Sequence, residues 1–268
     1  MNLVKIQVFC LCSLTVFVSS ATVNPLKGTG HPNVSIVGGI PARAGEFPFM
    51  TRLNVETWAG EPSLCGGTLI GPYHVLTAAH CYAPNGTTLY LNTLSSNGGG
   101  PGSLTRSVKK FIKYEKYSIK NKTYDIAILL LNAPVTTIPL VKLPSKSNIH
   151  LSYANMSAVI AGWGLTAYNS DTISPILLKT TVKIYGNQNC STYYKSGKTV
   201  FVGSMMLCAL GIKKDTCQGD SGGPILVNGF QVGITSFGSK CGNTTPGVYT
   251  RITAYLDWIA ATMKSNPK

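Results

Sequence analysis

The chain has 268 residues, of which 12% are charged and 44% hydrophobic, and its formal net charge is +14. A chain of this length can form one large domain or two small barrels around a substantial core. The low charged content and the ample hydrophobic content exclude an intrinsically disordered protein.

The first 21 residues have the pattern of a secretory signal peptide. Lys5 supplies the positive charge, residues 6–18 form an apolar stretch, and the small residues 19–21 form a cleavage site. A membrane anchor is the alternative, but the apolar stretch is too short to span a bilayer, and no later segment is long and apolar enough. We therefore predict a signal peptide over residues 1–21, and a secreted, extracellular protein without a membrane partner.

Residues 22–35 are polar and rich in Pro and Gly, so we expect an unpacked propeptide there and a folded domain over residues 36–268. The domain contains short apolar or β-branched runs separated by Gly, Pro and Asn, which is typical of an all-β barrel or sandwich. The pair Asn228-Gly229 between two apolar runs predicts a hairpin. Helical spacing of apolar residues in residues 253–263 predicts one amphipathic helix at the end of the chain. The apolar runs are residues 66–71, 125–131, 158–164, 224–238 and 247–252.

Six cysteines remain after the signal peptide, which removes Cys10 and Cys12. An even number in a secreted chain indicates three disulfides, although six cysteines allow fifteen connectivities. Several Asn-X-Ser/Thr sequons indicate a glycoprotein. The remaining cysteines are Cys65, Cys81, Cys190, Cys208, Cys217 and Cys241, and the sequons begin at Asn33, Asn85, Asn121, Asn155 and Asn243.

The positive charge is concentrated in residues 106–122, where Glu115 is the only acid. Such a segment could bind nucleic acid or another anionic surface. Its sheet-like pattern with interleaved aromatic residues is more typical of a solvated face, and no nucleic-acid motif accompanies it. We interpret the segment as a solvated face and expect no nucleic-acid partner.

Residues 215–224, DTCQGDSGGP, place Ser221 among turn residues. The pattern Gly-x-Ser-x-Gly matches the nucleophile elbow of α/β-hydrolases, in which the acid and the histidine follow the serine. All four histidines of this chain precede Ser221, so that fold is excluded. The Asp-His-Ser order of subtilisins is excluded for His80, because no aspartate precedes it. The order that remains is His, Asp, Ser.

Two residues fit the first two places of this order. His80 ends an apolar run beside Cys81, and Asp125 opens the apolar run of residues 125–131. A carboxylate at such a position is costly to bury unless it is hydrogen-bonded, and an imidazole N–H is a suitable donor. A structural histidine and a turn aspartate are the better interpretations of each residue alone, but three residues in the correct order favour catalysis.

A series of motifs now carries a resemblance to a known family. In chain order these motifs are IVGG (36–39), LTAAHC (76–81), DIAILLL (125–131), GWG (162–164), DTCQGDSGGP (215–224) and PGVYTRI (246–252). Together they resemble the chymotrypsin/trypsin-like serine proteases over nearly the entire chain after the leader. The resemblance implies an all-β fold of two six-stranded antiparallel β-barrels with a C-terminal α-helix, and an active site between the barrels.

The resemblance also implies catalytic roles, which follow the known template of this family. Ser221 would attack the carbonyl carbon of the cleaved bond, and His80 would accept the serine proton and pass it to the leaving amine. Asp125 would orient the imidazole. The backbone N–H groups of Gly219 and Ser221 would form the oxyanion hole.

By the same resemblance, Asp215 would form the floor of the specificity pocket, and Gly238 and Gly247 would leave that pocket wide enough for Arg or Lys. A recessed carboxylate lacks full solvation, so a cationic substrate side chain is a suitable partner. Asp220 would pair with the new α-amino group of Ile36 after cleavage of the leader, which makes the protein a zymogen.

The implied disulfides are Cys65–Cys81, Cys190–Cys208 and Cys217–Cys241. We expect no cofactor and no metal. Residues 82–114 contain no Asp or Glu, so this loop lacks the acidic ligands of the calcium site that vertebrate trypsins carry there. Zinc motifs are absent from the sequence as well.

One position departs from the family pattern. Ser35 stands before Ile36, where a basic residue is usual, so we expect an activating protease of a different specificity. Other expected partners are protein or peptide substrates with Arg or Lys at the cleavage position, and proteinaceous inhibitors of a monomeric enzyme. The alternative function is a catalytically silent protease homologue that acts as a binding or inhibitor protein.

Overall fold

The computed structural model describes residues 36–56, 62–83, 86–195 and 200–268. All of them belong to one compact unit, Asn33–Lys268. The predicted signal peptide, residues 1–21, and the predicted propeptide, residues 22–35, lie outside the described residues.

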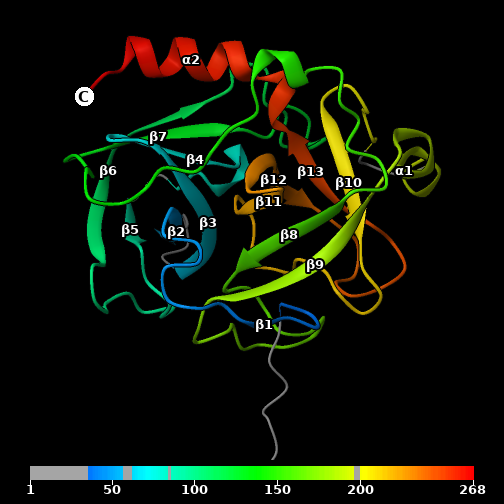
Figure 1. The fold of residues 1–268 in the computed structure, drawn as a ribbon, viewed down its shortest axis with the longest axis horizontal. Helices are drawn as coiled ribbons and strands as arrows, with labels where there is room; N and C mark the ends of the chain where they lie inside the picture. The colour runs from blue at the N-terminus through cyan, green and yellow to red at the C-terminus, as the bar shows by residue number, and fades with distance from the viewer. Residues whose placement is uncertain (1–35, 57–61, 84–85, 196–199) are drawn as a thin grey trace, which may run out of the picture. The chain divides into compact units, whose positions relative to one another are not determined.

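Six strands close the first barrel, in the order β2-β3-β4-β7-β6-β5, and every neighbouring pair is antiparallel. Its interior is built by period-2 alternation, since Leu53 in β2 and Leu89 in β5 are completely buried in one cluster. Figure 1 shows this barrel in blue to green. The strands are β2 Met50–Glu56, β3 Pro62–Gly71, β4 His74–Thr77, β5 Thr87–Leu91, β6 Leu104–Lys113 and β7 Ala127–Leu131.

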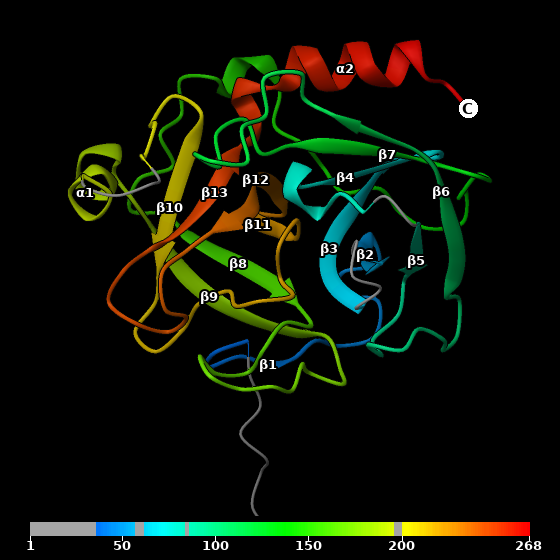
Figure 2. The same ribbon diagram turned by 180° about the vertical axis from the view of Figure 1, so that it is seen from behind.

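The second barrel also closes with six antiparallel strands, β8, β9, β10, β13, β12 and β11, because β8 pairs with both β9 and β11. The short strand β1 (Ile40–Pro41) adds to the edge of β9. Figure 2 shows the two barrels side by side from behind, so the predicted two-barrel fold is confirmed. The strands are β8 Ser157–Gly162, β9 Leu178–Tyr185, β10 Met206–Leu210, β11 Pro224–Val227, β12 Phe230–Phe237 and β13 Gly247–Arg251.

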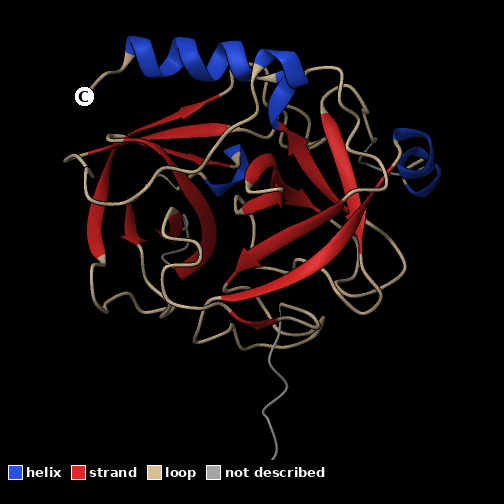
Figure 3. Cartoon of the chain, in the orientation of Figure 1, coloured by secondary structure: helices blue, strands red, loops and turns tan. Residues whose placement is uncertain are grey.

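Helices lie at the periphery of both barrels (Figure 3). The C-terminal helix α2 spans Leu256–Ser265, and buried Ile259 packs it into the core cluster of the first barrel. The sequence predicted a start at residue 253, but a 3-10 turn, Ile252–Ala254, precedes α2. Helix α1, Asn187–Tyr193, has no amphipathic pattern and was not predicted. Neither helix of the described segments is long and apolar enough to cross a membrane.

The predicted hairpin joins β11 to β12. Asn228 and Gly229 have φ values of 50° and 80°, which are the left-handed conformations that a two-residue hairpin turn requires. This hairpin lets β11 and β12 pair directly after the loop that carries Ser221.

The described segments contain three disulfides, and these have the connectivity that the family resemblance implied. Cys65–Cys81 joins β3 to the 3-10 turn Ala79–Cys81, Cys190–Cys208 joins α1 to β10, and Cys217–Cys241 joins two loops of the second barrel. Each of the three bonds therefore fixes a segment that lies next to the candidate site described below or that supports a residue of that site.

Candidate active site

The pairing of two first-barrel strands brings His80 and Asp125 together. Strand β4 pairs with β7 so that Thr77 lies opposite Ala127, and the two polar residues lie just beyond this pair. His80 Nδ1 lies 2.7 Å from Asp125 Oδ2, and the backbone N–H of His80 donates to Oδ1 at 2.9 Å. One carboxylate therefore holds His80 at two points, the imidazole through Oδ2 and the backbone N–H through Oδ1.

The second barrel supplies further partners to this carboxylate. The Ser236 hydroxyl in β12 donates to Asp125 Oδ2 at 2.5 Å, and Thr250 Oγ1 in β13 donates to the Asp125 carbonyl at 2.7 Å. Asp125 is 1% exposed. Burial alone would raise its pKa, but His80 and the hydrogen bonds from His80 and Ser236 hold the pKa below its ordinary value. Asp125 is thus kept as an anion beside the imidazole.

The loop of Ser221 packs directly against the segment that leads to His80. The Ser221 carbonyl accepts a 2.7 Å hydrogen bond from the Gly66 N–H, and Gly222 N–H donates to the Thr235 carbonyl at 2.8 Å. Gly222 has φ +81°, and a Cβ there would lie 3.1 Å from the Ala78 nitrogen. The Ser221 backbone therefore contacts both barrels, and its carbonyl oxygen lies 3.6 Å from Sγ of Cys81, the residue next to His80.

Gly219 requires the absence of a side chain for two reasons. Its φ is +96°, and a Cβ would lie 3.0 Å from Gly164 Cα and 3.1 Å from Leu64 Cδ2. In the described part of the chain, the N–H groups of Gly219 and Ser221 donate to no backbone carbonyl outside the strands and helices. These two amides are available to a developing negative charge on a substrate oxygen.

Asp215 lies in the segment between β10 and β11 of the second barrel. Its side chain is almost completely buried, Oδ1 has no hydrogen-bond partner, and Oδ2 accepts a 3.3 Å hydrogen bond from Gly242 N–H. Burial raises the pKa of Asp215 to about 7, and the Gly242 amide offsets only part of this effect. Among the described residues, no cation forms an ion pair with this carboxylate.

Two glycines, Gly247 and Gly238, lie in the immediate neighbourhood of Asp215. A Cβ at Gly247 would lie 3.0 Å from Asp215 Oδ1, and a Cβ at Gly238 would face only the Gly247 Cα, at 3.8 Å. The Cys217–Cys241 disulfide connects the Asp215 segment to the opposite loop. The structure therefore places all three predicted pocket residues together.

Asp220 and Ile36, which are predicted to act in activation, are both buried. The Asp220 carboxylate accepts hydrogen bonds from Gly164 N–H at 2.8 Å and from Cys217 N–H at 2.9 Å. Burial raises the pKa of Asp220 to about 7, because two amides do not replace a full cationic partner. Ile36 packs in the core cluster of the second barrel.

One cluster has the spacing of a metal site but not its chemistry. Cys65, His80 and Cys81 bring their ligand atoms within 4.8 Å of one another. The two cysteines form a disulfide, so they offer no thiolate to a metal ion. We therefore assign no metal to this cluster.

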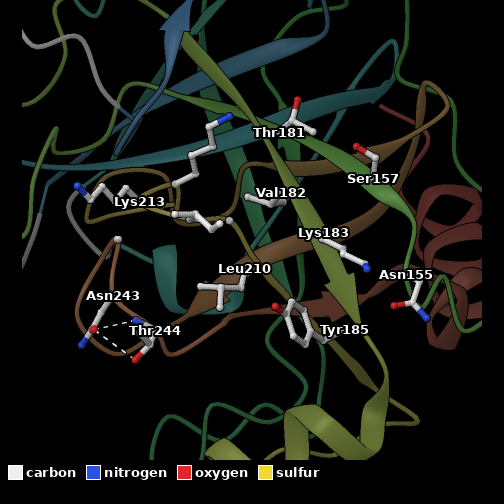
Figure 4. Close-up of a pocket in the computed structure, with 14 residues that line it drawn as sticks. Asn155, Ser157, Thr181, Val182, Lys183, Tyr185, Leu210, Lys213, Asn243 and Thr244 are labelled. Atoms are coloured by element: carbon white, nitrogen blue, oxygen red, sulfur yellow. Dashed lines mark hydrogen bonds between the residues drawn. The ribbon is translucent and has the colours of Figure 1, made fainter.

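A cavity of about 870 Å³ lies elsewhere, on the second barrel (Figure 4). Strand residues such as Val182, Lys183 and Leu210 line it, together with loop residues such as Lys213 and Asn243. None of its lining residues, in the segments the structure describes, is a histidine or an acid. This cavity therefore lacks a histidine or carboxylate that could act as a general base, and we place no catalysis there.

Sequence reasoning did not identify two supporting hydroxyls, those of Ser236 and Thr250. Both side chains are buried, and they lie in strands β12 and β13, most of whose residues are buried. The only available signal was that a hydroxyl in a buried strand needs a hydrogen-bond partner. The sequence could not indicate which residue that partner is.

Comparisons with known proteins agree with this architecture. The family model described as Trypsin matches residues 36–259. Trypsin Tyr p 3.0101 from Tyrophagus putrescentiae is 35% identical and covers 98% of this chain and 92% of its own length. Trypsin Blo t 3 from Blomia tropicalis is 33% identical, with coverage of 94% and 95%. Hypodermin-B from Hypoderma lineatum is 35% identical, with coverage of 86% and 88%.

A solved structure described as HL collagenase has a TM-score of 0.77 and 27% sequence identity to this chain. The match covers 85% of this chain and 99% of the other. The family match extends across both barrels and includes every residue of the candidate site.

Proposed function

Because the chain belongs to the trypsin family of serine proteases, we propose that it is a secreted endopeptidase that hydrolyses peptide bonds after Arg or Lys. The observation that carries the Arg/Lys preference is the buried carboxylate of Asp215, which has an oxygen without a hydrogen-bond partner and lies beside Gly247 and Gly238, where no side chain stands. A substrate guanidinium or ammonium would supply the missing counter-charge. Three disulfides support secretion, because such bonds persist in oxidising compartments.

In the proposed mechanism, Ser221 Oγ attacks the carbonyl carbon while His80 accepts its proton, and the amides of Gly219 and Ser221 stabilise the oxyanion. His80 then protonates the leaving amine, and the acyl group remains on Ser221. Water, deprotonated by His80, attacks the ester and releases the acid product. Asp125 holds the imidazole in position through Oδ2, while Oδ1 accepts a hydrogen bond from the backbone N–H of His80.

Activation in this proposal follows cleavage between Ser35 and Ile36. The new ammonium group would pair with Asp220, whose buried carboxylate otherwise has only two amide donors. Ser35 does not fit an enzyme that cleaves after Arg or Lys, so another protease performs this cut. N-terminal sequencing of the secreted protein is expected to read Ile-Val-Gly-Gly, and a different start would contradict the proposal.

The function is tested with protein that begins at Ile36 and with amide substrates of Arg, Lys and Phe. Arg and Lys amides are expected to be cleaved and the Phe amide is not. Ser221→Ala should abolish cleavage, and Asp215→Ser should remove the cleavage after Arg and Lys selectively. A preference for Phe would contradict the assigned specificity. No activity at all from verified Ile36 protein would favour the catalytically silent homologue.

A further inference from the structure

Arg52 lies on the face of β2 that points away from the interior of the first barrel. Leu53 and Val55 on the same strand are buried in the core cluster of that barrel, and side chains alternate between the two faces of a strand. Met50, on the same face as Arg52, packs with Trp163 of the second barrel. The guanidinium is therefore directed to the junction between the barrels.

The neighbours of Arg52 on that face leave it uncompensated. Its partner on β3 is Gly66, which has no side chain, and its partner on β5 is Tyr90. The guanidinium carbon lies 5.7 Å from the centre of the Tyr90 ring. Such a cation–π contact is weaker than a pairing with a carboxylate.

Arg52 is a buried cation without an anionic partner in the described segments. It is 7% exposed, and its Nε atom is buried without a hydrogen-bond partner. The described ion-pair contacts are those of His80 with Asp125, Lys146 with Asp257 and Lys179 with Glu46, and none includes Arg52. Burial lowers the pKa of Arg52, which reflects the same lack of solvation.

A cavity of about 360 Å³ opens beside this guanidinium and reaches the candidate active site. Arg52, Asn54 and Ser63 line one end, and Leu64, Gln218 and Gly219 line the other. None of the described residues that line it is acidic. The cavity therefore offers a positive charge and hydrogen-bonding groups, and no described residue that lines it carries a neutralising negative charge.

The cavity lies on the leaving-group side of the cleaved bond, a placement that rests on the proposed function. Asp215, Gly238 and Gly247, which would hold the side chain before the bond, do not line this cavity. With the substrate carbonyl oxygen at the Gly219 amide, the leaving part of the peptide would continue away from that pocket, across Gly219 and Leu64. Side chains after the bond would then reach Arg52.

We propose that Arg52 forms a subsite for an acidic substrate residue, Asp or Glu, at one of the two positions after the cleaved bond. The carboxylate would accept hydrogen bonds from the guanidinium in the partly dehydrated cavity, where such charge-assisted bonds are strong. A substrate Lys or Arg at the same position would be repelled. Arg52 thus makes this protease selective on both sides of the bond, for a cation before it and an anion after it.

The test compares quenched peptides that differ only at these two positions, with Glu, Gln or Lys at each, and with Arg before the cleaved bond. For the Ile36 protein, Glu is expected to raise kcat/KM about tenfold or more over the matched Gln peptide at one of the positions, as a hydrogen bond to a charged group typically does. Arg52→Gln should bring this ratio close to one, and Arg52→Lys should retain part of it. The Arg43→Gln variant, at an exposed arginine outside this cavity, should keep the full ratio.

An Arg amide with no residue after the bond separates this selectivity from general damage to the enzyme. Its kcat/KM should be the same in Arg52→Gln and in the wild type. A Glu-to-Gln ratio of one in the wild type, or an unchanged ratio in Arg52→Gln, overturns the subsite. If the wild type cleaves the amide of a residue other than Arg or Lys, this contradicts the proposed specificity but not the subsite. The peptide comparison is then repeated with that residue in place of Arg before the cleaved bond.

A binding measurement, which needs no catalysis, tests the subsite even if the protein is catalytically silent. The Ser221→Ala protein is titrated with fluorescent versions of the same Glu and Gln peptides. Tighter binding of the Glu peptide, lost in the Ser221→Ala/Arg52→Gln double variant, supports the subsite. Equal binding of both peptides overturns it.

Discussion

Ser236 of the second barrel donates a 2.5 Å hydrogen bond to the same oxygen of Asp125 that lies 2.7 Å from His80 Nδ1. Asp125 and His80 both come from the first barrel, next to the paired strands β4 and β7. The orientation of the carboxylate therefore depends on how the second barrel packs against the first. Any loosening between the barrels would reach the imidazole through this one hydroxyl.

Ser236→Ala tests this dependence. The variant removes one hydrogen bond to a charged, buried acceptor, which is typically worth about 1.5–3 kcal/mol. We expect kcat/KM for an Arg amide to fall about tenfold or more, with little change in the binding of an amidine inhibitor. Ser107→Ala, at an exposed serine of β6, is the matched control. Unchanged kinetics in Ser236→Ala would show that the carboxylate is held sufficiently by His80 alone.

Much of the fold could be predicted from local patterns. Apolar runs separated by turn residues correspond to strands of both barrels, and Asn228-Gly229 forms the predicted hairpin because few residue pairs accept its backbone angles. His80 and Asp125 were paired from their order along the chain, and the structure brings them into contact. Their catalytic roles remain predictions.

The remaining features depend on contacts between distant segments. Ser236 acquires its importance only when β12 meets Asp125 of the first barrel, and Arg52 only when β2 shares a cavity with Gly219 of the second. Neither residue lies in a motif. An arginine in an alternating strand is normally a solvent-facing residue, so its burial could not be expected. Helix α1 has no apolar stripe, and it is held instead by the Cys190–Cys208 disulfide.

The raised pKa of Asp215 predicts a pH-dependent pocket. Because the pKa is raised to about 7 in the folded protein, the carboxyl is protonated below that pH and cannot pair with a cation. The affinity of the Ser221→Ala protein for an aryl amidine should rise about tenfold per pH unit from pH 5 toward 7 and then level off. Calorimetry in two buffers should detect proton release on binding near pH 6. An affinity that is constant from pH 5 to 8 would contradict this prediction.

Burial also raises the pKa of Asp220 to about 7, so the experiment must distinguish the titration of Asp215 from that of Asp220. The experiment therefore uses protein that begins at Ile36, in which the proposed ammonium partner would lower the pKa of Asp220. In Asp215→Asn, both the amidine binding and the associated proton release should be lost. Proton release that persists in Asp215→Asn would assign the titration to another group.

Gly247→Ala should close the specificity pocket at its base. The new methyl group would lie 3.0 Å from Asp215 Oδ1, which is closer than most such contacts, and it would occupy the space that a substrate cation needs. We expect KM for Arg and Lys amides to rise at least tenfold, as one misplaced methyl group in a pocket typically costs 1–3 kcal/mol. Gly45→Ala, where a Cβ would meet nothing within 4 Å but φ is +73°, measures the effect of a glycine change away from the pocket. Equal KM values for Gly247→Ala and the wild type would contradict the pocket.

The Cys190–Cys208 disulfide supports the pocket wall from behind. Tyr194, which directly follows α1, packs with both cysteines in one cluster, and its hydroxyl donates a 2.5 Å hydrogen bond to the Pro246 carbonyl next to Gly247. The Tyr194 ring also contacts Phe237 edge-on, with 5.6 Å between the ring centres.

Removal of this bond in Cys190→Ala/Cys208→Ala should therefore affect stability and specificity together. The two cysteines are 18 residues apart in the sequence. Loss of the bond that closes this loop should lower the free energy of unfolding by about 2–4 kcal/mol, measured by denaturant titration. Since Tyr194 would lose its anchor, KM for Arg amides should rise more than kcat falls. A loss of stability with unchanged KM would mean that the wall is held by Tyr194 and Phe237 without the disulfide.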